Sequence, residues 1–183
     1  MRTFFLLLFN SEQAAVSLKG EDSRAAYQRT LWLFAVLGVL RYVLFITPEE
    51  ENRLFVVNLG FTILHVFLML WFALVLGFSL SVLANWLGAK QHREYVIPLL
   101  GYAFVPIVLF NAIAVLEHYI SQLNELIPHH VLAMLSYIAW LLALWILLVG
   151  VKRLFNFSYA RSVFLPLSLV LIKCATIVLF LWL

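Results

Sequence analysis

The stretch Arg93–His118, REYVIPLLGYAFVPIVLFNAIAVLEH, decides the fold. It is apolar and long enough to cross a bilayer as a helix, which takes about 20 residues. It also contains Pro98 and Pro106, and a proline inside a helix crowds the carbonyl four residues earlier, here that of Tyr102. In lipid, such a carbonyl needs a partner from a packed helix, a hydroxyl group or water. With the small Gly101 beside it, the stretch is predicted to be a kinked central helix that does not face lipid.

The composition of the whole chain indicates a membrane protein. Of its 183 residues, 65% are hydrophobic and 11% are charged, whereas a soluble domain is about half apolar and roughly a quarter charged. Too few polar side chains remain to cover a surface that faces water. Cys174 is the only cysteine, so an internal disulfide is excluded. Because no linker-like segment divides the chain, residues 1–183 are predicted to form one membrane domain.

Five apolar runs are long enough to span a bilayer. The predicted fold is therefore all-α, a polytopic membrane protein built as a bundle of five transmembrane helices. The spans are expected near residues 28–46, 54–87, 95–119, 130–151 and 159–183. Pro166 predicts a kink in the last of them.

Residues 1–27 precede the first span. The run Thr3–Phe9 is short and no small-x-small cleavage site follows it, so a cleaved signal peptide is not expected. The apolar residues of this segment fall near one face of a helix, and its charged residues lie elsewhere. Residues 1–27 are therefore predicted to form an amphipathic helix that lies in the membrane interface.

Lysines and arginines predict the orientation, because they are retained on the cytoplasmic side during insertion. Nine of them precede the first span or lie in the loops between spans two and three and between spans four and five. The opposite loops contain only Arg53. The N-terminus is therefore predicted to be cytoplasmic and the C-terminus to lie outside.

Small residues on the second span indicate a packing face. Gly77, Ser81, Ala84 and Gly88 recur at helical spacing, which allows another backbone to approach closely. The expected neighbour is another helix of the same chain, and the seam of a homo-oligomer is the alternative.

Polar side chains inside the spans are the candidate functional residues. They are Arg41, His65, Asn111, Glu117 and Lys173. An ionisable group at such depth costs ~3 kcal/mol on insertion scales and usually faces a partner or a water-filled cavity. Glu117 is the only carboxylate on a span, so it is the expected partner of Arg41 or Lys173. The alternatives are that Arg41 and Lys173 snorkel outward, or that they line an ion or substrate pathway.

Signatures of catalysis and metal binding are missing. The sequence contains no HExxH, no GxSxG and no phosphate-binding glycine loop. Glu117, His118, Glu125, His129 and His130 cluster near the loop after span three, but without a recognised ligand spacing. We expect no enzymatic activity, no cofactor and no metal. Outside the inner loops the sequence has no basic face that would indicate nucleic-acid binding. The basic residues of the inner loops favour binding to anionic lipid headgroups, by ~1 kcal/mol per well-placed charge.

Several short motifs resemble those of the Yip family of integral membrane proteins. They are the Leu87–Lys90 turn, Gly101-Tyr102-x-x-x-Pro106, the Gly150–Lys152 exit from span four, and Phe157–Arg161 at the entry to span five. The resemblance runs from about Gln28 onward and implies a non-enzymatic membrane protein. Eukaryotic relatives bind Rab-type GTPases and act in vesicle traffic and Golgi organisation. This chain lacks their long N-terminal region and their Asp-Leu-Tyr-Gly-Pro pattern, so it looks like the compact prokaryotic members, which implies a bacterial inner membrane.

Two functions are compatible with these features. The first is an adaptor in membrane organisation or trafficking, acting through helix packing, protein and lipid contacts, and association with itself or another membrane protein. The second is a small transporter or channel that uses Arg41, Glu117 and Lys173 as a polar pathway. A bundle without a cavity favours the first, and a continuous polar crevice that reaches Glu117 favours the second.

Overall fold

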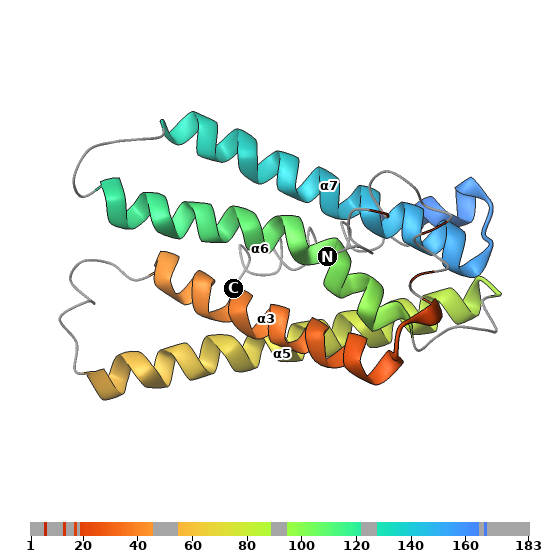
Figure 1. Ribbon diagram of the computed structural model, residues 1–183, viewed down its shortest axis with the longest axis horizontal. Coiled ribbons are helices and arrows are strands. Elements are labelled where there is room, and N and C mark those ends of the chain that lie inside the picture. The colour runs from red at the N-terminus through yellow and green to blue at the C-terminus, as the bar shows by residue number, and fades with distance from the viewer. Residues whose placement is uncertain are drawn as a thin grey trace, which may run out of the picture.

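The computed structural model describes residues 6, 13, 17, 19–45, 55–88, 95–121, 128–164 and 167. Over these residues the chain is helical and contains no strand. The long helices are α3 (Ser23–Phe45), α5 (Phe55–Trp86), α6 (Val96–Ser121) and α7 (His129–Phe155). Successive helices run in opposite directions (Figure 1), and a further helix begins at Tyr159. The described part of the chain is therefore all-α, as predicted.

Three helices in the described part are long and apolar enough to cross a membrane. They are Val57–Trp86, Val96–Tyr119 and His130–Phe155. Three of the five predicted spans therefore correspond to helices that could cross a membrane. α3 is not among them because arginines at 24, 29 and 41 make it less apolar, although its 23 residues give about 35 Å at 1.5 Å per residue.

Two predicted segments lie largely outside the described residues. In the fifth predicted span, residues 159–164 and 167 are described and helical. In the predicted N-terminal amphipathic helix, the described residues before 19 are 6, 13 and 17. Both segments stay predictions.

Local chemistry explains where the helices begin and end. The side chain of Asp22 accepts a hydrogen bond from the backbone N–H of Arg24 at 3.1 Å, which caps the first turn of α3. α5 ends in a turn at Gly88, whose φ of 95° suits glycine. α7 ends at Asn156, which adopts the left-handed conformation and donates its N–H to the carbonyl of Lys152. With these signals, α3 begins several residues before the predicted first span, and α7 ends several residues after the predicted fourth span.

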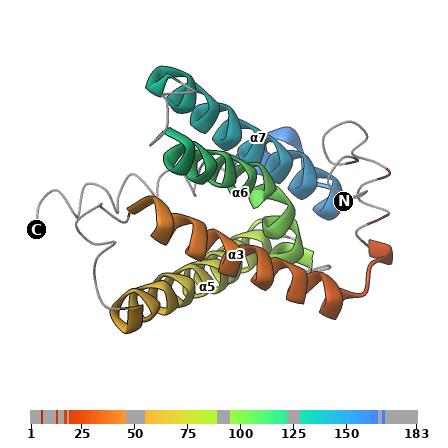
Figure 2. The same ribbon diagram turned by 60° about the vertical axis from the view of Figure 1, so that its left-hand side comes forward.

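α6 is the central helix of the described bundle. It lies between α7 on one side and α3 and α5 on the other, in both views (Figures 1 and 2), and it packs against all three. In its apolar segment 44% of the residues are buried, compared with 22% for α5 and for α7. The prediction of a central helix is confirmed, but the expectation that it does not face lipid is wrong for its second half, where Leu109, Ile113 and Leu116 are exposed.

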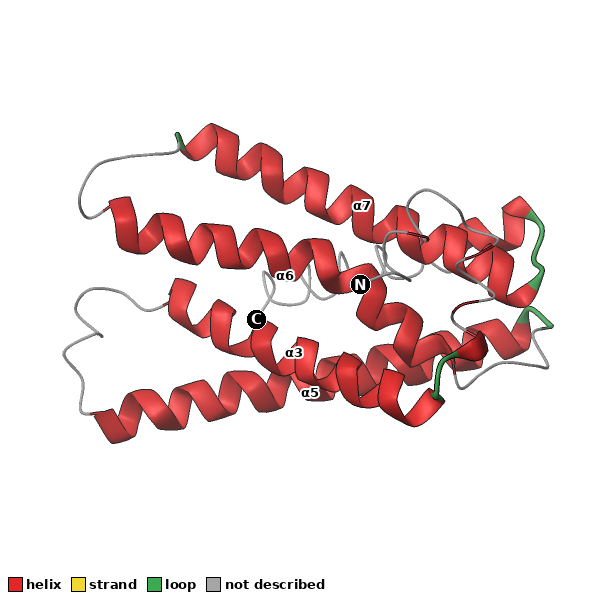
Figure 3. Ribbon diagram, viewed as in Figure 1, coloured by secondary structure: helices red, strands yellow, loops and turns green. Residues whose placement is uncertain are grey.

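α6 is also bent. Figure 3 shows its N-terminal third turned away from the axis of the rest, and Pro106 lies inside the helix. Pro98 falls in the first turn, where the missing N–H costs no helical hydrogen bond. The predicted kink is therefore present, and it belongs to Pro106.

An aromatic cluster joins the four long helices, with one ring from each; Phe34 and Phe104 are buried, whereas Phe72 is 42% exposed. Phe104 of α6 lies 4.8 Å from Phe34 of α3 and 6.1 Å from Trp140 of α7, measured between ring centroids. Phe72 of α5 contacts Phe104 edge-on at 6.3 Å and Phe34 at 6.5 Å. Tilted and edge-on contacts of this kind add about 0.5–1.5 kcal/mol each beyond area burial. We call Phe34, Phe72, Phe104 and Trp140 the aromatic cluster.

Candidate functional site

The motif Gly101-Tyr102-x-x-x-Pro106 lies where three helices close around the start of α6. A side chain at Gly101 would overlap the Oγ1 atom of Thr30 on α3, and its Cβ would lie 2.9 Å from the Thr30 Cβ. Thr30 is buried and donates its hydroxyl to the carbonyl of Ala26 at 3.0 Å. α3 and α6 therefore cross at Gly101, as small residues permit in membrane helices.

Two more glycines make the matching approaches from the other helices. A Cβ at Gly77 of α5 would lie 2.6 Å from Cγ1 of Ile97, and one at Gly150 of α7 would overlap Cδ1 of Leu99. Ile97, Leu99 and Gly101 thus meet α5, α7 and α3 in turn. The first two turns of α6 are therefore where α3, α5 and α7 each approach this helix closely.

The four small residues that were predicted to form a packing face differ in their surroundings. Gly77 and Ala84 are buried and Ser81 is half-buried. Gly88 lies beyond the helix, and a Cβ there would have no heavy atom within 4 Å. Gly88 serves the turn and not the packing face, because its φ of 95° requires the conformational freedom of glycine.

Tyr102 joins the start of α6 to the chain before α3. Its hydroxyl donates to the carboxylate of Glu21, 2.8 Å from each oxygen. Arg29 places Nη2 3.6 Å from the same carboxylate. Tyr95, about two turns earlier, donates its hydroxyl to the backbone carbonyl of Lys19 at 3.2 Å. The pattern of residues does not predict the contact of Glu21 with Tyr102, because the two lie 81 positions apart in the sequence.

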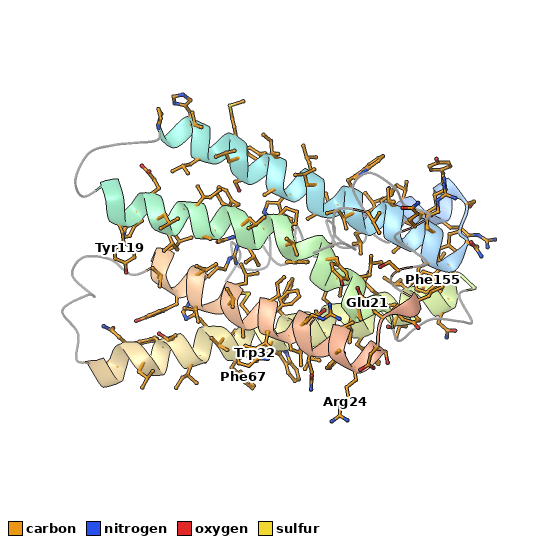
Figure 4. All side chains as sticks on the ribbon, in the orientation of Figure 1. Glu21, Arg24, Trp32, Phe67, Tyr119 and Phe155 are labelled. Carbon is orange, nitrogen blue, oxygen red and sulfur yellow. The ribbon has the colours of Figure 1, made fainter. Side chains whose placement is uncertain are left out.

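Basic residues gather at the end of the bundle where α3 and α6 begin and α5 and α7 end. Figure 4 places Glu21, Arg24 and Phe155 here and Tyr119 at the opposite end. The Lys152 ammonium lies 2.9 Å from the centroid of the Tyr159 ring, a cation–π contact between α7 and the next helix. We call this the basic end; its described cations are Lys19, Arg24, Arg29, Lys152, Arg153 and Arg161.

The predicted intramembrane polar residues lie toward the opposite end. Glu117 is buried, with 8% of its surface exposed, and Arg41 is half-buried. Within the described residues the structure shows no ion pair between Arg41 and Glu117. Lys173 lies outside the described residues, so its pairing with Glu117 stays a prediction.

His65 takes part in a polar contact between α3 and α5 that includes two residues absent from the prediction. The Tyr42 hydroxyl donates to Oδ1 of Asn58 at 3.1 Å, and the Tyr42 ring packs on His65 at 5.3 Å. His65 places Nδ1 2.9 Å from the carbonyl of Phe61. Because a carbonyl only accepts, Nδ1 carries the proton in this contact.

Two buried polar side chains bond to the backbone carbonyl four residues earlier in the chain. Asn111 donates its amide to the carbonyl of Ile107 at 2.7 Å, and the hydroxyl of Ser162 donates to the carbonyl of Ser158 at 2.9 Å. Among the described side chains, no buried nitrogen or oxygen lacks a hydrogen-bond partner. The same residues contain no group of three histidine, cysteine or acidic side chains arranged to hold a metal.

The surface of the described bundle is strongly apolar. Large side chains point outward along α5 and α7, including Phe67, Phe78, Tyr137 and Leu141, each more than half exposed (Phe67 is labelled in Figure 4). Water does not tolerate so large an apolar surface on a monomer, whereas acyl chains do. Its long apolar helices and its apolar outer surface make this a polytopic, helical integral membrane protein.

Comparison with known families gives one match. The Yip1 domain matches residues 5–182, essentially the whole chain. The chain therefore belongs to the Yip1 family, and the resemblance noted in the sequence is confirmed. No curated protein and no solved structure matches it.

Proposed function

We propose that this protein is a non-enzymatic adaptor of the Yip1 family, which acts in membrane organisation or trafficking through protein and lipid contacts. The observation that carries the proposal is the aromatic cluster. Rings from α3, α5, α6 and α7 contact one another, and those of Phe34 and Phe104 are buried in the core of the described bundle. A packed apolar core of this kind supports a function that is carried by the surfaces of the protein.

Transport is the competing function, and the polar residues weigh against it. A pathway needs polar groups that face one another across a hydrated space. Asn111 instead bonds to the backbone of its own helix. The aromatic cluster lies between these groups and the basic end, so a solute would have to displace it.

The arrangement in the membrane is part of the same proposal. We infer five spans, with α3 as the first and the helix that begins at Tyr159 as the fifth. Successive helices run in opposite directions (Figure 1), so the described cations come together at the basic end. Positive charge stays in the cytoplasm, which supports a cytoplasmic N-terminus and an outward C-terminus. The resemblance to the compact prokaryotic members of the family is the basis for proposing a bacterial inner membrane.

The basic end also supports contact with anionic lipid headgroups. Arg24, Arg153 and Arg161 are half-buried or exposed at the level where headgroups would lie, and each well-placed charge contributes ~1 kcal/mol. The lipid-facing sides of α5 and α7 are available for a second copy or another membrane protein.

Flux in proteoliposomes tests the proposal against its competitor. The full chain is reconstituted and loaded with H⁺-, K⁺- and Cl⁻-sensitive dyes, beside empty liposomes and the Glu117→Gln variant. The adaptor proposal expects no flux above empty liposomes and no effect of the variant. Flux that Glu117→Gln abolishes would establish transport and overturn the proposal.

In-membrane crosslinking tests whether the protein contacts a protein partner, as an adaptor should. A photoreactive amino acid is placed at Tyr137 of α7, which is 73% exposed, and at the buried Leu100 of α6 as the control. From position 137 we expect a discrete adduct with one protein, which is either another membrane protein or a second copy of this chain. From position 100 we expect no adduct. Adducts with lipid alone at position 137 and at the equally outward Phe78 would contradict an adaptor role.

A further inference from the structure

We propose that the Gly-Tyr-x-x-x-Pro motif is the dock for the chain's own segment 19–22, with Tyr102 as the positioning residue. This inference is independent of the adaptor role. It concerns what the motif does within the protein, and it assigns a separate task to each of Gly101, Tyr102 and Pro106.

The contacts with the segment come from Tyr95, just before α6, and from Tyr102, within it. Tyr95 bonds to the carbonyl of Lys19 at 3.2 Å, and Tyr102 bonds to both carboxylate oxygens of Glu21 at 2.8 Å. Leu6, farther toward the N-terminus, packs against the hydrophobic core. The chain before α3 is therefore held against the bundle at several separate points.

The three motif residues act together. Gly101 allows α3 to approach until Thr30 occupies the place of a side chain, which brings the beginning of α3 close to α6. Pro106 bends α6 (Figure 3), so that its first turns leave the axis of the rest. Tyr102, adjacent to Gly101, then lies within reach of Glu21. Without the bend or the close crossing, the hydroxyl and the carboxylate would not meet.

The hydroxyl of Tyr102 lies closer to the Glu21 carboxylate than the guanidinium of Arg29 does. The ion pair with Arg29 spans 3.6 Å, and the Arg29 side chain is 58% exposed. Exposed pairs of this kind contribute little. The hydroxyl of Tyr102 is half-buried and donates to a charged acceptor, a bond roughly twice as strong as a neutral one. Removing that hydroxyl should therefore release the segment while leaving the ring in place.

Hydrogen–deuterium exchange of the full chain in lipid nanodiscs tests the dock. In Tyr102→Phe we expect amides 20–26 to exchange about tenfold faster, the size expected for loss of a hydrogen bond to a charged acceptor. The amides of α5 and α7 should be unchanged. Glu21→Ala should give the same increase, and the double variant should add little to either single change.

Two further variants sharpen the reading. Tyr95→Phe, which removes a bond to a neutral carbonyl, should raise exchange over the same amides by a smaller factor. Tyr137→Phe removes a hydroxyl from the exposed face of α7 and is the matched control, with no effect expected on amides 20–26.

Three outcomes would overturn the proposal. The first is unchanged exchange over amides 20–26 in Tyr102→Phe. The second is an increase spread equally over all helices, which would make Tyr102 a general support of the bundle. The third is full additivity of Tyr102→Phe and Glu21→Ala, which would mean that the two side chains act independently.

Discussion

Thr30 of α3 occupies the space that any side chain at Gly101 of α6 would need. The overlap involves the Oγ1 atom of Thr30, and its Cβ and Cγ2 lie 2.9 and 3.0 Å from the hypothetical Cβ. The neighbouring atoms belong to a short, branched side chain whose hydroxyl is already bonded to Ala26. The crossing cannot relax by rotating a flexible side chain away, so helix spacing here depends on glycine.

Gly101→Ala should therefore destabilise the protein by about 1–3 kcal/mol, the usual cost of over-packing a close-packed site. The measurement is reversible unfolding in mixed micelles, followed by circular dichroism. Gly60→Ala on α5 is the control, because a Cβ there has no heavy atom within 4 Å; it should be neutral or slightly stabilising. Equal effects at the two glycines would contradict the crossing as the cause.

Phe104→Ala should cost about 3–5 kcal/mol, because it removes the ring that contacts Phe34, Phe72 and Trp140 and leaves a cavity. Phe67→Ala removes the same side chain from a surface position that is 60% exposed, so little change is expected. Both variants are compared by the same unfolding experiment. If Phe67→Ala were the more damaging, the inward and lipid-facing sides of the bundle would have to be exchanged.

Gly88→Ala should destabilise the turn after α5 by about 1–2 kcal/mol, since a side chain disfavours the left-handed region. Packing does not contribute, because open space surrounds the position. Gly88→Asn should cost less, since asparagine tolerates positive φ better than alanine. Thermal unfolding of the three proteins checks the order glycine, asparagine, alanine, and an alanine variant as stable as the parent would exclude the conformational explanation.

Much of this architecture could be predicted because proline, glycine and long apolar runs have direct physical meanings. Pro106 predicted the bend and Gly101 the crossing, since each residue type changes what the backbone can do locally. α3 begins at Ser23, before the predicted span at 28–46, because the cap at Asp22 precedes the apolar run.

Other features could not be predicted from the pattern of residues. In a helix that is apolar all round, inward and lipid-facing positions have the same composition, so Phe104 and Phe67 look alike in sequence although 6% of one and 60% of the other is exposed. The contact of Glu21 with Tyr102 joins residues 81 positions apart. Only the relative placement of α3 and α6 brings these side chains together.

Pro106→Ala should straighten α6 by restoring the backbone hydrogen bond to the carbonyl of Tyr102. Alanine is also the better helix former, by ~3 kcal/mol in a helix interior, so α6 itself should become more regular. Straightening moves the first turns of α6 relative to α3, and Tyr102 then loses its position opposite Glu21.

The change is measured with two spin labels, one at Trp32 on the exposed side of α3 and one at Tyr119 near the end of α6. The native Cys174 is replaced by serine. We expect their distance distribution to shift in Pro106→Ala and to stay fixed in Tyr102→Phe, which removes the dock without altering the backbone. An unshifted distribution in Pro106→Ala would mean that packing against α3, α5 and α7 imposes the bend without help from the proline.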